Sequence, residues 1–409
     1  MLLVAPSGSY RIAAYTRAAH ALGMPILVVS NSAHSLVSEV ASGITVDFSE
    51  PQTAYADIVA AIAGRKIACV LATDDSCVEL CSRVAQYLGL PQNSPRAALL
   101  TQRKDLAREA LVDAGCNTPA FQRVEIADAN AASLSIDYPV VVKPLALSAS
   151  RGVIRADNDE SYEAALQRID RILESSGLQG ETRDYLLVES YIDGAEYAVE
   201  GFVVDGRFRL LTIFDKPEPL TGPFFEETYY LTPSRLHEPG RTALIDEVER
   251  CCAAYGLEHG PVHAEARLTD SGPVLLELAA RTIGGQCGQL IEFSLQQKLE
   301  ELVIKGMCGL PFPVAAEAES AGVLMIPITD SGILKRVEGL TEAQQTEYVR
   351  DIEIHINPGY ELLPLPEGAS YLGFIFVQAP DYDQTLAALK AAYKKLRFVT
   401  QPRWSLETG

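Results

Sequence analysis

The stretch GPVHAEARLTDSGPVLLE (260–277) decides the fold, because it has the pattern of two apolar strands joined by a polar turn. Glu265 and Glu277 each lie six residues from Ser271. If the turn centres there, the two-residue period of a strand brings both carboxylates to one face of neighbouring strands. Gly272 suits the left-handed position of a three-residue hairpin loop. Facing like charges destabilise a sheet unless a cation such as Mg²⁺, which prefers oxygen ligands, lies between them. Taken alone, the pair fits a metal site and two solvated acids about equally well.

Arg281 favours the metal interpretation. If the second strand continues through this residue, Arg281 lies on the same face as Glu277. A guanidinium in that position can hold an anionic substrate or an anion that develops in a transition state. Gly284 and Gly285 follow, and they allow the backbone to bend closely around a ligand.

A second segment, PVVVKPLALSASRGV (139–153), is an apolar strand that ends at Lys143 and opens into a small, hydroxyl-rich loop. Such a loop can surround phosphates with backbone N–H groups and with the hydroxyls of Ser148 and Ser150, while Lys143 supplies positive charge. It is not a Walker loop, because the Gly-Lys-Ser/Thr order is missing. A plain surface hairpin explains this segment equally well when it is taken alone.

A third segment, LLVESYIDGAEYAVE (186–200), is a strand that ends at Glu189, turns at Asp193-Gly194 and resumes with acidic residues. A chain that enters and leaves a cleft in this way can bind adenine through its backbone and ribose through a carboxylate. An ordinary strand–turn–strand is the simpler interpretation of this segment alone. Further along, the segment 217–239 is rich in Pro, Gly and aromatic residues, and the sequence predicts one helix over 287–306.

The flanking regions differ in character. In the first hundred residues, apolar strands alternate with helical patterns, one of them near 35–41, which predicts a parallel, doubly wound sheet. A dinucleotide fingerprint is missing, since only Gly8 follows the first strand. From about residue 315 the chain is again rich in strand patterns. We therefore expect an α/β protein with a Rossmann-like unit (1–95), a central unit (96–314) and a small β-rich α+β unit (315–409).

Composition limits the classes of function. The chain has 34 Lys and Arg against 54 Asp and Glu, a formal charge of −20. A surface this negative repels nucleic acid and anionic membranes, so a polyphosphate has to bind in a local pocket of lysine, backbone N–H groups and metal. The eight cysteines are scattered and form no CxxC pair. This favours reduced structural thiols and a cytoplasmic protein.

The three segments, in this order and at these separations, resemble the ATP-grasp superfamily from about residue 95 to 310. The flanking units resemble the flanking domains of the same proteins. The resemblance implies an ATP-grasp fold with a lid subdomain at about 119–190. It also implies that two lysines and the loop reach the ATP phosphates, that a hinge holds adenine and that an acidic residue binds ribose. The implied ATP-binding residues are Lys104, Lys143, Ser148, Ser150, Gly152, Glu189, Tyr191, Ile192 and Glu196.

The resemblance also assigns the catalytic and metal roles. Glu265 and Glu277 match the Mg²⁺ ligands, with Mn²⁺ as a candidate substitute. Arg281 matches the arginine that steadies the acyl phosphate and the tetrahedral intermediate, and Lys143 is the second implied catalytic residue. The superfamily often reads Glu-x-Asn-x-Arg at the second metal acid, whereas this chain has Ala279 in place of the Asn. The number of metal ions is therefore open.

The segment DKPEPLTGPFFEETYYLTP (215–233), together with His263-Ala-Glu265, looks like the L-amino-acid (dipeptide) ligases and related carboxylate–amine ligases. A covering loop without substrate contact is the alternative for this segment, and a histidine that packs under the sheet is the alternative for His263. The implied substrate-binding residues are Lys216, Glu226, Glu227, His263, Arg281, Gly284 and Gly285.

The resemblance implies an enzyme that makes an amide from a carboxylate and an amine through an acyl phosphate, releasing ADP and phosphate. Amino acids are the expected small-molecule substrates, a homodimer is the expected assembly, and no nucleic acid or membrane partner is expected. Two alternatives stay open: a bicarbonate-using carboxylase or purine-type ligase, and a nucleotide-binding regulatory protein without turnover.

Overall fold

The computed structural model describes residues 1–32, 42–311 and 319–402, so the helix expected near 35–41 lies outside the described residues. The N-terminal unit is the doubly wound sheet that the sequence predicts. Its strands are parallel and ordered β3-β2-β1-β4. They are β1 (Leu2–Val4), β2 (Leu27–Ser30), β3 (Ser42–Thr45) and β4 (Val70–Ala72).

Helices lie on both sides of this sheet, which explains why every residue of β1 and β2 is buried. Leu3 packs on the side of helix α1 (Arg11–Ala21), whereas Leu2 and Val4 pack toward helices α2 (Pro51–Ile62) and α3 (Asp75–Leu88). The inner strands β1 and β2 therefore have no solvated face, and ligand-facing groups have to come from the edges and strand ends of the sheet.

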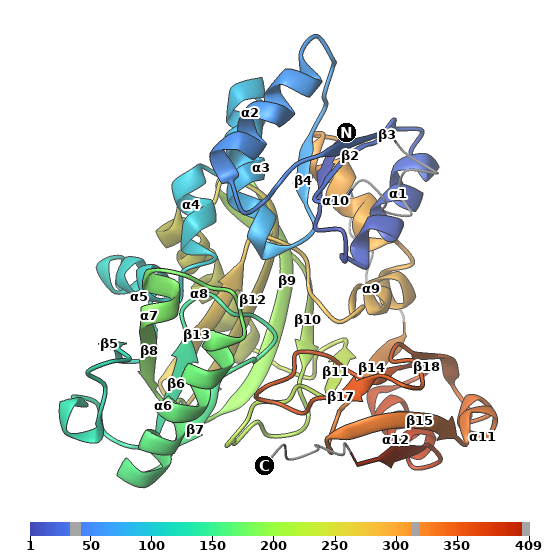
Figure 1. The fold of residues 1–409 in the computed structure, drawn as a ribbon. Helices are drawn as coiled ribbons and strands as arrows, with labels where there is room; N and C mark the ends of the chain where they lie inside the picture. Colours follow the sequence, from blue (N-terminus) through green and yellow to red (C-terminus); the bar gives the residue numbers. More distant parts are fainter. Residues whose placement is uncertain (33–41, 312–318, 403–409) are drawn as a thin grey trace, which may run out of the picture.

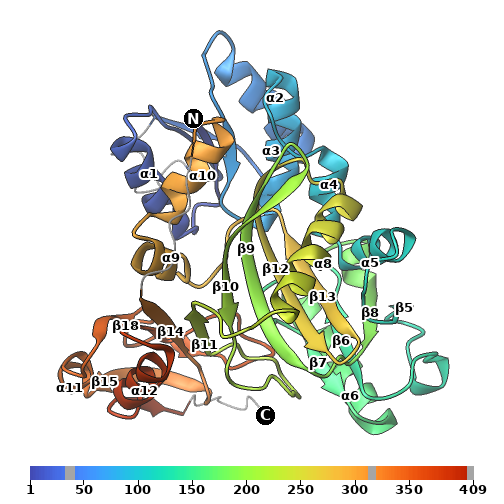
Figure 2. The ribbon, with the colours of Figure 1, turned by 180° about the vertical axis from the view of Figure 1, so that it is seen from behind.

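The centre of the molecule is an eight-stranded sheet in the order β13-β12-β9-β10-β11-β14-β18-β16. Helix α8 (Gly240–Tyr255) packs against the hairpin end of this sheet (Figures 1 and 2). The strands are β9 (Ala195–Val204), β10 (Arg207–Asp215), β11 (Tyr229–Thr232), β12 (His259–Thr269), β13 (Gly272–Ala279), β14 (Ser320–Ile326), β16 (Val349–Ile354) and β18 (Gly373–Ala379). This sheet runs across the boundary expected at 314, because β14, β16 and β18 extend it.

Two features of the central region differ from expectation. β11 lies inside the Pro-, Gly- and aromatic-rich segment 217–239, in which the sequence predicts no strand; this short strand pairs with the distant β14 and so leaves little local signal. The single helix expected over 287–306 is two helices, α9 (Gly288–Leu295) and α10 (Leu299–Met307). The break falls at Gln296, which adopts a left-handed conformation with φ of 54° and ends α9.

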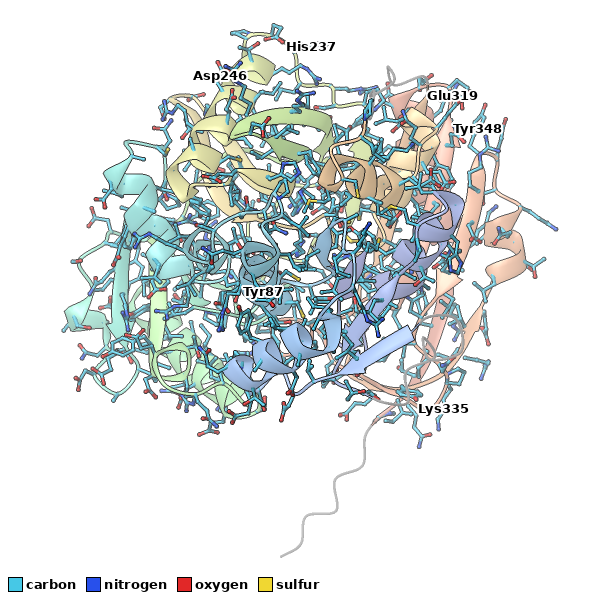
Figure 3. The ribbon with its side chains drawn as sticks, turned by 90° about the horizontal axis from the view of Figure 1, so that it is seen from above. Tyr87, His237, Asp246, Glu319, Lys335 and Tyr348 are labelled. Carbon is cyan, nitrogen blue, oxygen red and sulfur yellow. The ribbon has the colours of Figure 1, made fainter. Side chains whose placement is uncertain are left out.

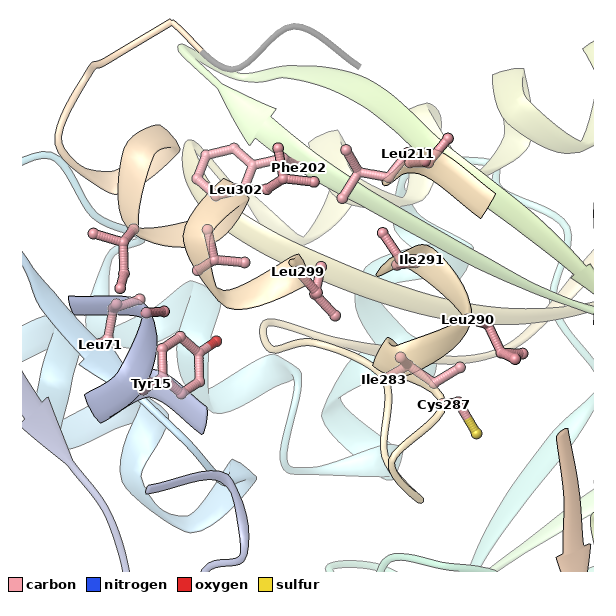
Figure 4. Packing of buried hydrophobic residues seen from close by; sticks show 14 of the residues in the cluster. Tyr15, Leu71, Phe202, Leu211, Ile283, Cys287, Leu290, Ile291, Leu299 and Leu302 are labelled. Atoms are coloured by element: carbon pink, nitrogen blue, oxygen red, sulfur yellow. The ribbon is translucent and has the colours of Figure 1, made fainter. Parts of the chain in front are cut away.

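Helices α9 and α10 connect the N-terminal unit to the central sheet. Figure 4 shows their apolar side chains packed between Tyr15 and Leu71 of the N-terminal unit and Phe202 and Leu211 of the central strands. Ile283 belongs to the same cluster. The loop that follows Arg281 is thus anchored in the core.

The lid is a separate antiparallel sheet in the order β5-β8-β6-β7, covered by helix α6 (Asp159–Glu174). The side chains of Asn158 and Ser161 cap the start of α6 reciprocally. In Figure 1 the lid and the C-terminal unit lie on either side of the long central strands. The strands of the lid are β5 (Phe121–Glu125), β6 (Val140–Pro144), β7 (Ile154–Ala156) and β8 (Tyr185–Ser190).

The remaining elements are peripheral. A second sheet, β17-β15-β19, lies in the C-terminal unit together with helices α11 and α12. Exposed side chains such as His237 and Lys335 lie at the outer edges in Figure 3. In the part of the chain that the structure describes, no helix is long and apolar enough to cross a membrane. The remaining bounds are α4 (Pro95–Leu100), α5 (Lys104–Asp113), α7 (Glu181–Asp184), β15 (Gly332–Glu338), α11 (Leu340–Gln344), β17 (Glu361–Leu362), α12 (Tyr382–Tyr393) and β19 (Arg397–Gln401).

Candidate active site

The hairpin β12–β13 places the two predicted metal ligands opposite each other, since Glu265 pairs directly with Glu277. The turn has two residues (270–271) and not the three that we expected. With such a turn alone Glu265 would face Leu276. An extra residue in β13, a β-bulge at Leu276, shifts the register by one and brings Glu277 into position. The expected pairing is confirmed, although a bulge and not the loop length produces it.

A buried arginine that sequence reasoning missed holds this bulge. Arg108, on α5, donates from Nη2 to the carbonyl of Leu276 (2.5 Å) and from Nε to the carboxylate of Glu189 (2.6 Å). The other oxygen of Glu189 lies 2.5 Å from Nζ of Lys143. Burial alone would raise the pKa of Glu189, but Arg108 and Lys143 outweigh burial and lower that pKa to about 2. The ionised carboxylate therefore orients Lys143.

The second lysine approaches the hairpin from α5. Nζ of Lys104 donates to the carbonyl of Leu147 (2.8 Å) in the loop 145–152 and lies 3.7 Å from the Glu277 carboxylate. Lys104 and Lys143 therefore line the same cavity as the acidic pair, from two different elements. Their binding of phosphate stays a prediction.

The loop 145–152 has a backbone suited to anion binding. Ala149 and Ser150 have φ angles of 55° and 54°, a conformation that costs energy in residues other than glycine and clusters at functional sites. Gly152 has φ of 72°, and a Cβ there would lie 2.8 Å from Cγ of Pro144, so glycine is required. Ser148 and Ser150 line the two cavities described below.

The hinge after β8 forms an aromatic, apolar end to the site. The Tyr191 ring stacks on Phe225 with their centroids 6.4 Å apart, and the guanidinium of Arg267 lies 5.1 Å from the Tyr191 centroid. Arg267 also donates to the carbonyl of Ile192 (2.6 Å). A planar base fits such an environment, and the predicted adenine contacts of Tyr191 and Ile192 are compatible with it.

Lys216 is the centre of a charged cluster. Its Nζ lies 2.7 Å from Glu196 and 3.2 Å from Glu265, and it also contacts Glu227. Although burial opposes it, the three carboxylates hold the pKa of Lys216 well above its usual value. Glu196 also pairs with Arg267 at 2.9 Å. The predicted ribose acid therefore already carries two cation partners, of which sequence reasoning missed Arg267.

Two neighbouring cavities contain these groups. The inner cavity lies between the lid and the central sheet, and the outer cavity, of 570 Å³, lies between the central sheet and the two flanking units. Glu265, Glu277 and Glu227 line both cavities. The predicted residues on the inner cavity are Lys104, Lys143, Ser148, Ser150, Glu189, Tyr191, Ile192 and Glu196, and those on the outer cavity include His263, Arg281, Gly284 and Gly285.

Arg281 reaches the outer cavity from a position different from the expected one. Strand β13 ends at Ala279, so Arg281 lies in the loop beyond it and is not part of the strand. Its Nε donates to Asp75 (3.0 Å), at the start of α3, and its Nη1 donates to the carbonyl of Thr282 (2.9 Å). The acid that orients this arginine thus comes from the N-terminal unit.

His263 is held between two acids, with Nδ1 3.1 Å from Glu200 and Nε2 3.4 Å from Glu265. Burial would lower the pKa of His263, but these carboxylates outweigh burial and raise the pKa to about 9. Glu200 also accepts a hydrogen bond from the backbone N–H of Ile283 (3.0 Å). Three predicted residues, Glu226, Lys216 and Gly152, line neither cavity. Ala279 pairs with His263 and offers no oxygen ligand.

Several residues of the outer cavity were missed. Tyr10 and Arg11 follow β1, and Asp74 and Asp75 follow β4, and all four line that cavity. Ligands of open parallel sheets bind at the carboxyl ends of the strands, so this position could have pointed to them. The C-terminal unit adds His355, Ser370 and Tyr371, for which the sequence held no such signal.

Comparisons with known proteins agree with this geometry. Residues 136–289 match the family model of the ATP-grasp domain, and residues 16–92 match that of the ATP-grasp N-terminal domain. Residues 324–401 match the family model of the L-amino acid ligase C-terminal domain 2. The chain belongs to the ATP-grasp superfamily.

Within that class it is similar to amino-acid ligases. A solved L-amino acid ligase from Bacillus licheniformis superposes with a TM-score of 0.84 at 24% identity, covering 98% of each chain. Alanine–anticapsin ligase of Bacillus subtilis is 28% identical over 56% of this chain and 51% of its own length. The protein y4rH of Sinorhizobium fredii is 24% identical over 82% of this chain and 69% of its own. The chain thus spans about half the length of that curated ligase.

Proposed function

We propose that this chain is an ATP-dependent carboxylate–amine ligase that activates a carboxylate as an acyl phosphate and passes it to an amine, with an amino acid among its substrates. One observation carries the proposal. Glu265 and Glu277 face each other beside Lys104 and Lys143, and the same acids line a second cavity that contains Arg281. A phosphate-binding wall and a substrate cavity therefore share one acidic pair.

The residues present fit ATP and Mg²⁺. Two carboxylates in register supply the hard oxygen ligands that Mg²⁺ prefers while it shares substrate phosphates. When bound at Glu265 and Glu277, the ion would neutralise phosphate charge. Loop 145–152 and the two lysines would hold the phosphates, and the apolar end at Tyr191 would hold the base.

The chain's own residues support each step by position and charge. The terminal phosphoryl group of ATP passes to a carboxylate oxygen, and the bond to the ADP oxygen breaks. Lys143, oriented by Glu189, would stabilise the charge that develops on that group. An amine nitrogen then attacks the acyl carbon and loses a proton, the bond from the acyl carbon to the phosphate oxygen breaks, and phosphate leaves. Arg281, oriented by Asp75, would stabilise the oxyanion of this second step.

The lid protects the intermediate from water. The inner cavity has a volume of only 90 Å³, smaller than a typical ligand pocket, so ATP binding requires the lid to move away from the central sheet. Its return over the phosphates would exclude water, since hydrolysis would destroy the acyl phosphate.

Incubation with ATP, Mg²⁺ and amino-acid mixtures tests the proposal. We expect ADP and phosphate to be released together with a new amide, identified by mass spectrometry. AMP and pyrophosphate would refute the mechanism. Phosphate release that needs bicarbonate and no amine would favour a carboxylase or purine-type ligase, and tight ATP binding without phosphate release would favour a regulatory protein.

We also propose that the protein is a cytoplasmic homodimer. The eight free cysteines suit the cytoplasm, and a biotin carboxylase domain among the structural neighbours is a dimer. Sedimentation would test the dimer.

A further inference from the structure

A second hollow lies beside the outer cavity, between the lid loop and the C-terminal unit. This groove has a volume of 520 Å³. It shares His355, Ile356, Ala369 and Ser370 with the outer cavity, so the two adjoin along these residues. A molecule in the outer cavity that is long enough to extend past these residues would reach the groove.

One part of the groove wall is apolar. Tyr360 is 65% exposed and Leu363 is 47% exposed, and both line the groove. The buried side chain of Ile328 adds to the same wall. Large apolar side chains that gather beside a cavity mark a contact surface more often than single exposed residues do.

The opposite wall provides a cation. Arg151, at the end of the lid loop, donates from Nε to the carbonyl of Glu367 (3.1 Å) and from Nη2 to Ser175 (3.3 Å). A guanidinium has five N–H donors, so these two contacts orient it and leave donors for an anion. The carboxylate of Glu367 itself is paired with both Nε and Nη2 of Arg168, at 2.6 Å and 2.9 Å, which offsets its charge.

The two substrates of the proposed reaction need different degrees of enclosure. The carboxylate substrate becomes a water-sensitive acyl phosphate and has to lie deep, beside Glu277 and Arg281. The amine therefore approaches from the outer side, where the outer cavity opens into the groove. A free amino acid is accommodated in the outer cavity alone, and only a longer amine reaches Tyr360 and Arg151.

We propose that the groove is an acceptor subsite for a short peptide, whose amine lies in the outer cavity, whose apolar second residue packs on Tyr360 and Leu363, and whose terminal carboxylate binds Arg151. This inference rests on the proposed ligase activity and deepens it by naming the class of acceptor. It also gives the lid loop a contact with both substrates, since Ser148 and Ser150 face the phosphates while Arg151 faces the acceptor.

The test compares three acceptors with one fixed carboxylate substrate: the amino acid that the amide screen identifies, the dipeptide in which leucine follows it, and the amide of that dipeptide. We expect kcat/KM for the dipeptide to exceed that for the amino acid by about tenfold, equivalent to ~1.4 kcal/mol. Tyr360→Ala should remove most of this gain through KM and leave the amino acid within about twofold. Leu310→Ala, at another exposed apolar position, is the matched control and should change neither.

Arg151→Gln separates the acceptor contact from an effect on the lid. Any effect through loop 145–152 on the phosphates should be the same for both acceptors. The variant should therefore lower kcat/KM further for the dipeptide than for its amide, because the amide has no carboxylate to lose. Three results would each overturn the inference. The first is that Arg151→Gln lowers kcat/KM equally for the dipeptide and its amide. The second is that wild-type kcat/KM is equal for the dipeptide and the amino acid, and the third is that Tyr360→Ala affects both of these acceptors equally. Amide formation with the free amino acid in any of these cases would leave the proposed ligase activity standing. Absence of amide with all acceptors would instead refute that activity itself.

Discussion

The substitution Arg108→Met should cost far more stability than removal of a typical surface arginine, because Arg108 ties three parts of the site together. Its guanidinium contacts Glu189 and the carbonyl of Leu276, and the side chains of Arg108 and Glu189 are only 3% and 2% exposed. Methionine fills a similar volume but leaves the Glu189 carboxylate with Lys143 alone. It also leaves the bulge carbonyl without this donor.

The magnitude follows from burial. Removal of one partner of a buried ion pair costs about 3–5 kcal/mol, because a charge remains without compensation in a poorly solvating environment. Arg336 provides a matched control. Its Nη2 lies 2.6 Å from Glu338, the same separation as in the Arg108–Glu189 pair, but its side chain is 62% exposed. Arg336→Met should cost under about 1 kcal/mol.

Urea denaturation followed by circular dichroism measures both variants. A double-mutant cycle with Glu189→Gln then isolates the pair. Arg108→Met should cost at least about 1.5 kcal/mol less in the Glu189→Gln background than in the wild type. If Arg108→Met and Arg336→Met lowered the free energy of unfolding equally, the assignment of a structural role to the buried pair would be wrong.

The same pair predicts a pH dependence. Burial alone would raise the pKa of Glu189, but Arg108 and Lys143 lower this pKa from 4.5 to about 2. A lowered folded-state pKa contributes stability that is complete above the unfolded value and is lost as the pH falls toward the folded value. The contribution is about 3 kcal/mol and should disappear between about pH 4.5 and pH 2. In urea titrations across this range, the stability advantage of the wild type over Glu189→Gln should shrink; a constant difference would contradict the assignment.

Three further predictions concern activity. Asp75→Asn should lower kcat roughly tenfold to a hundredfold without raising KM for ATP, because it loosens Arg281, and steady-state kinetics will measure both constants. Lys104→Ala should raise KM for ATP about tenfold, with an unchanged urea midpoint as the check on folding. Arg168→Gln breaks the ion pair between the lid and the C-terminal unit; the ratio of ADP released to amide formed should rise, since water would reach the acyl phosphate, and an unchanged ratio would contradict this role of the lid contact.

The sequence predicts the fold classes of all three units because hydrophobic periodicity is local. It also places Glu265 and Glu277 together, because the alternation of a hairpin depends only on nearby residues. The bulge at Leu276 and the break at Gln296 escape such reasoning. The bulge is held by Arg108, far away in the chain, and the break by packing of α9 and α10 against the N-terminal unit.

The candidate site shows the same difference between features encoded by nearby residues and features that depend on distant contacts. Lys104, Lys143 and the acidic pair come from motifs that can be recognised locally, and the structure brings them together. The residues that orient them do not carry such motifs, because their roles exist only where separate units meet. Asp75 reaches Arg281 from the N-terminal unit, and Glu189 reaches Lys143 from a neighbouring strand of the lid.

The distribution of charge explains how a chain of net charge −20 can hold a polyphosphate. In the structure, Lys104 lies against Glu277 and Lys216 against Glu265, so each acid of the pair has an ammonium group within 4 Å. A cation that enters between the two acids would compete with both lysines, and Lys104 would then be free to turn toward phosphate oxygens, whereas Lys216 would keep Glu196 and Glu227 as partners. Free ATP, without its ion, would meet the carboxylates with only part of their charge offset. The proposed arrangement would therefore favour a metal-bound nucleotide over the bare one, and the negative surface around it would repel long polyanions.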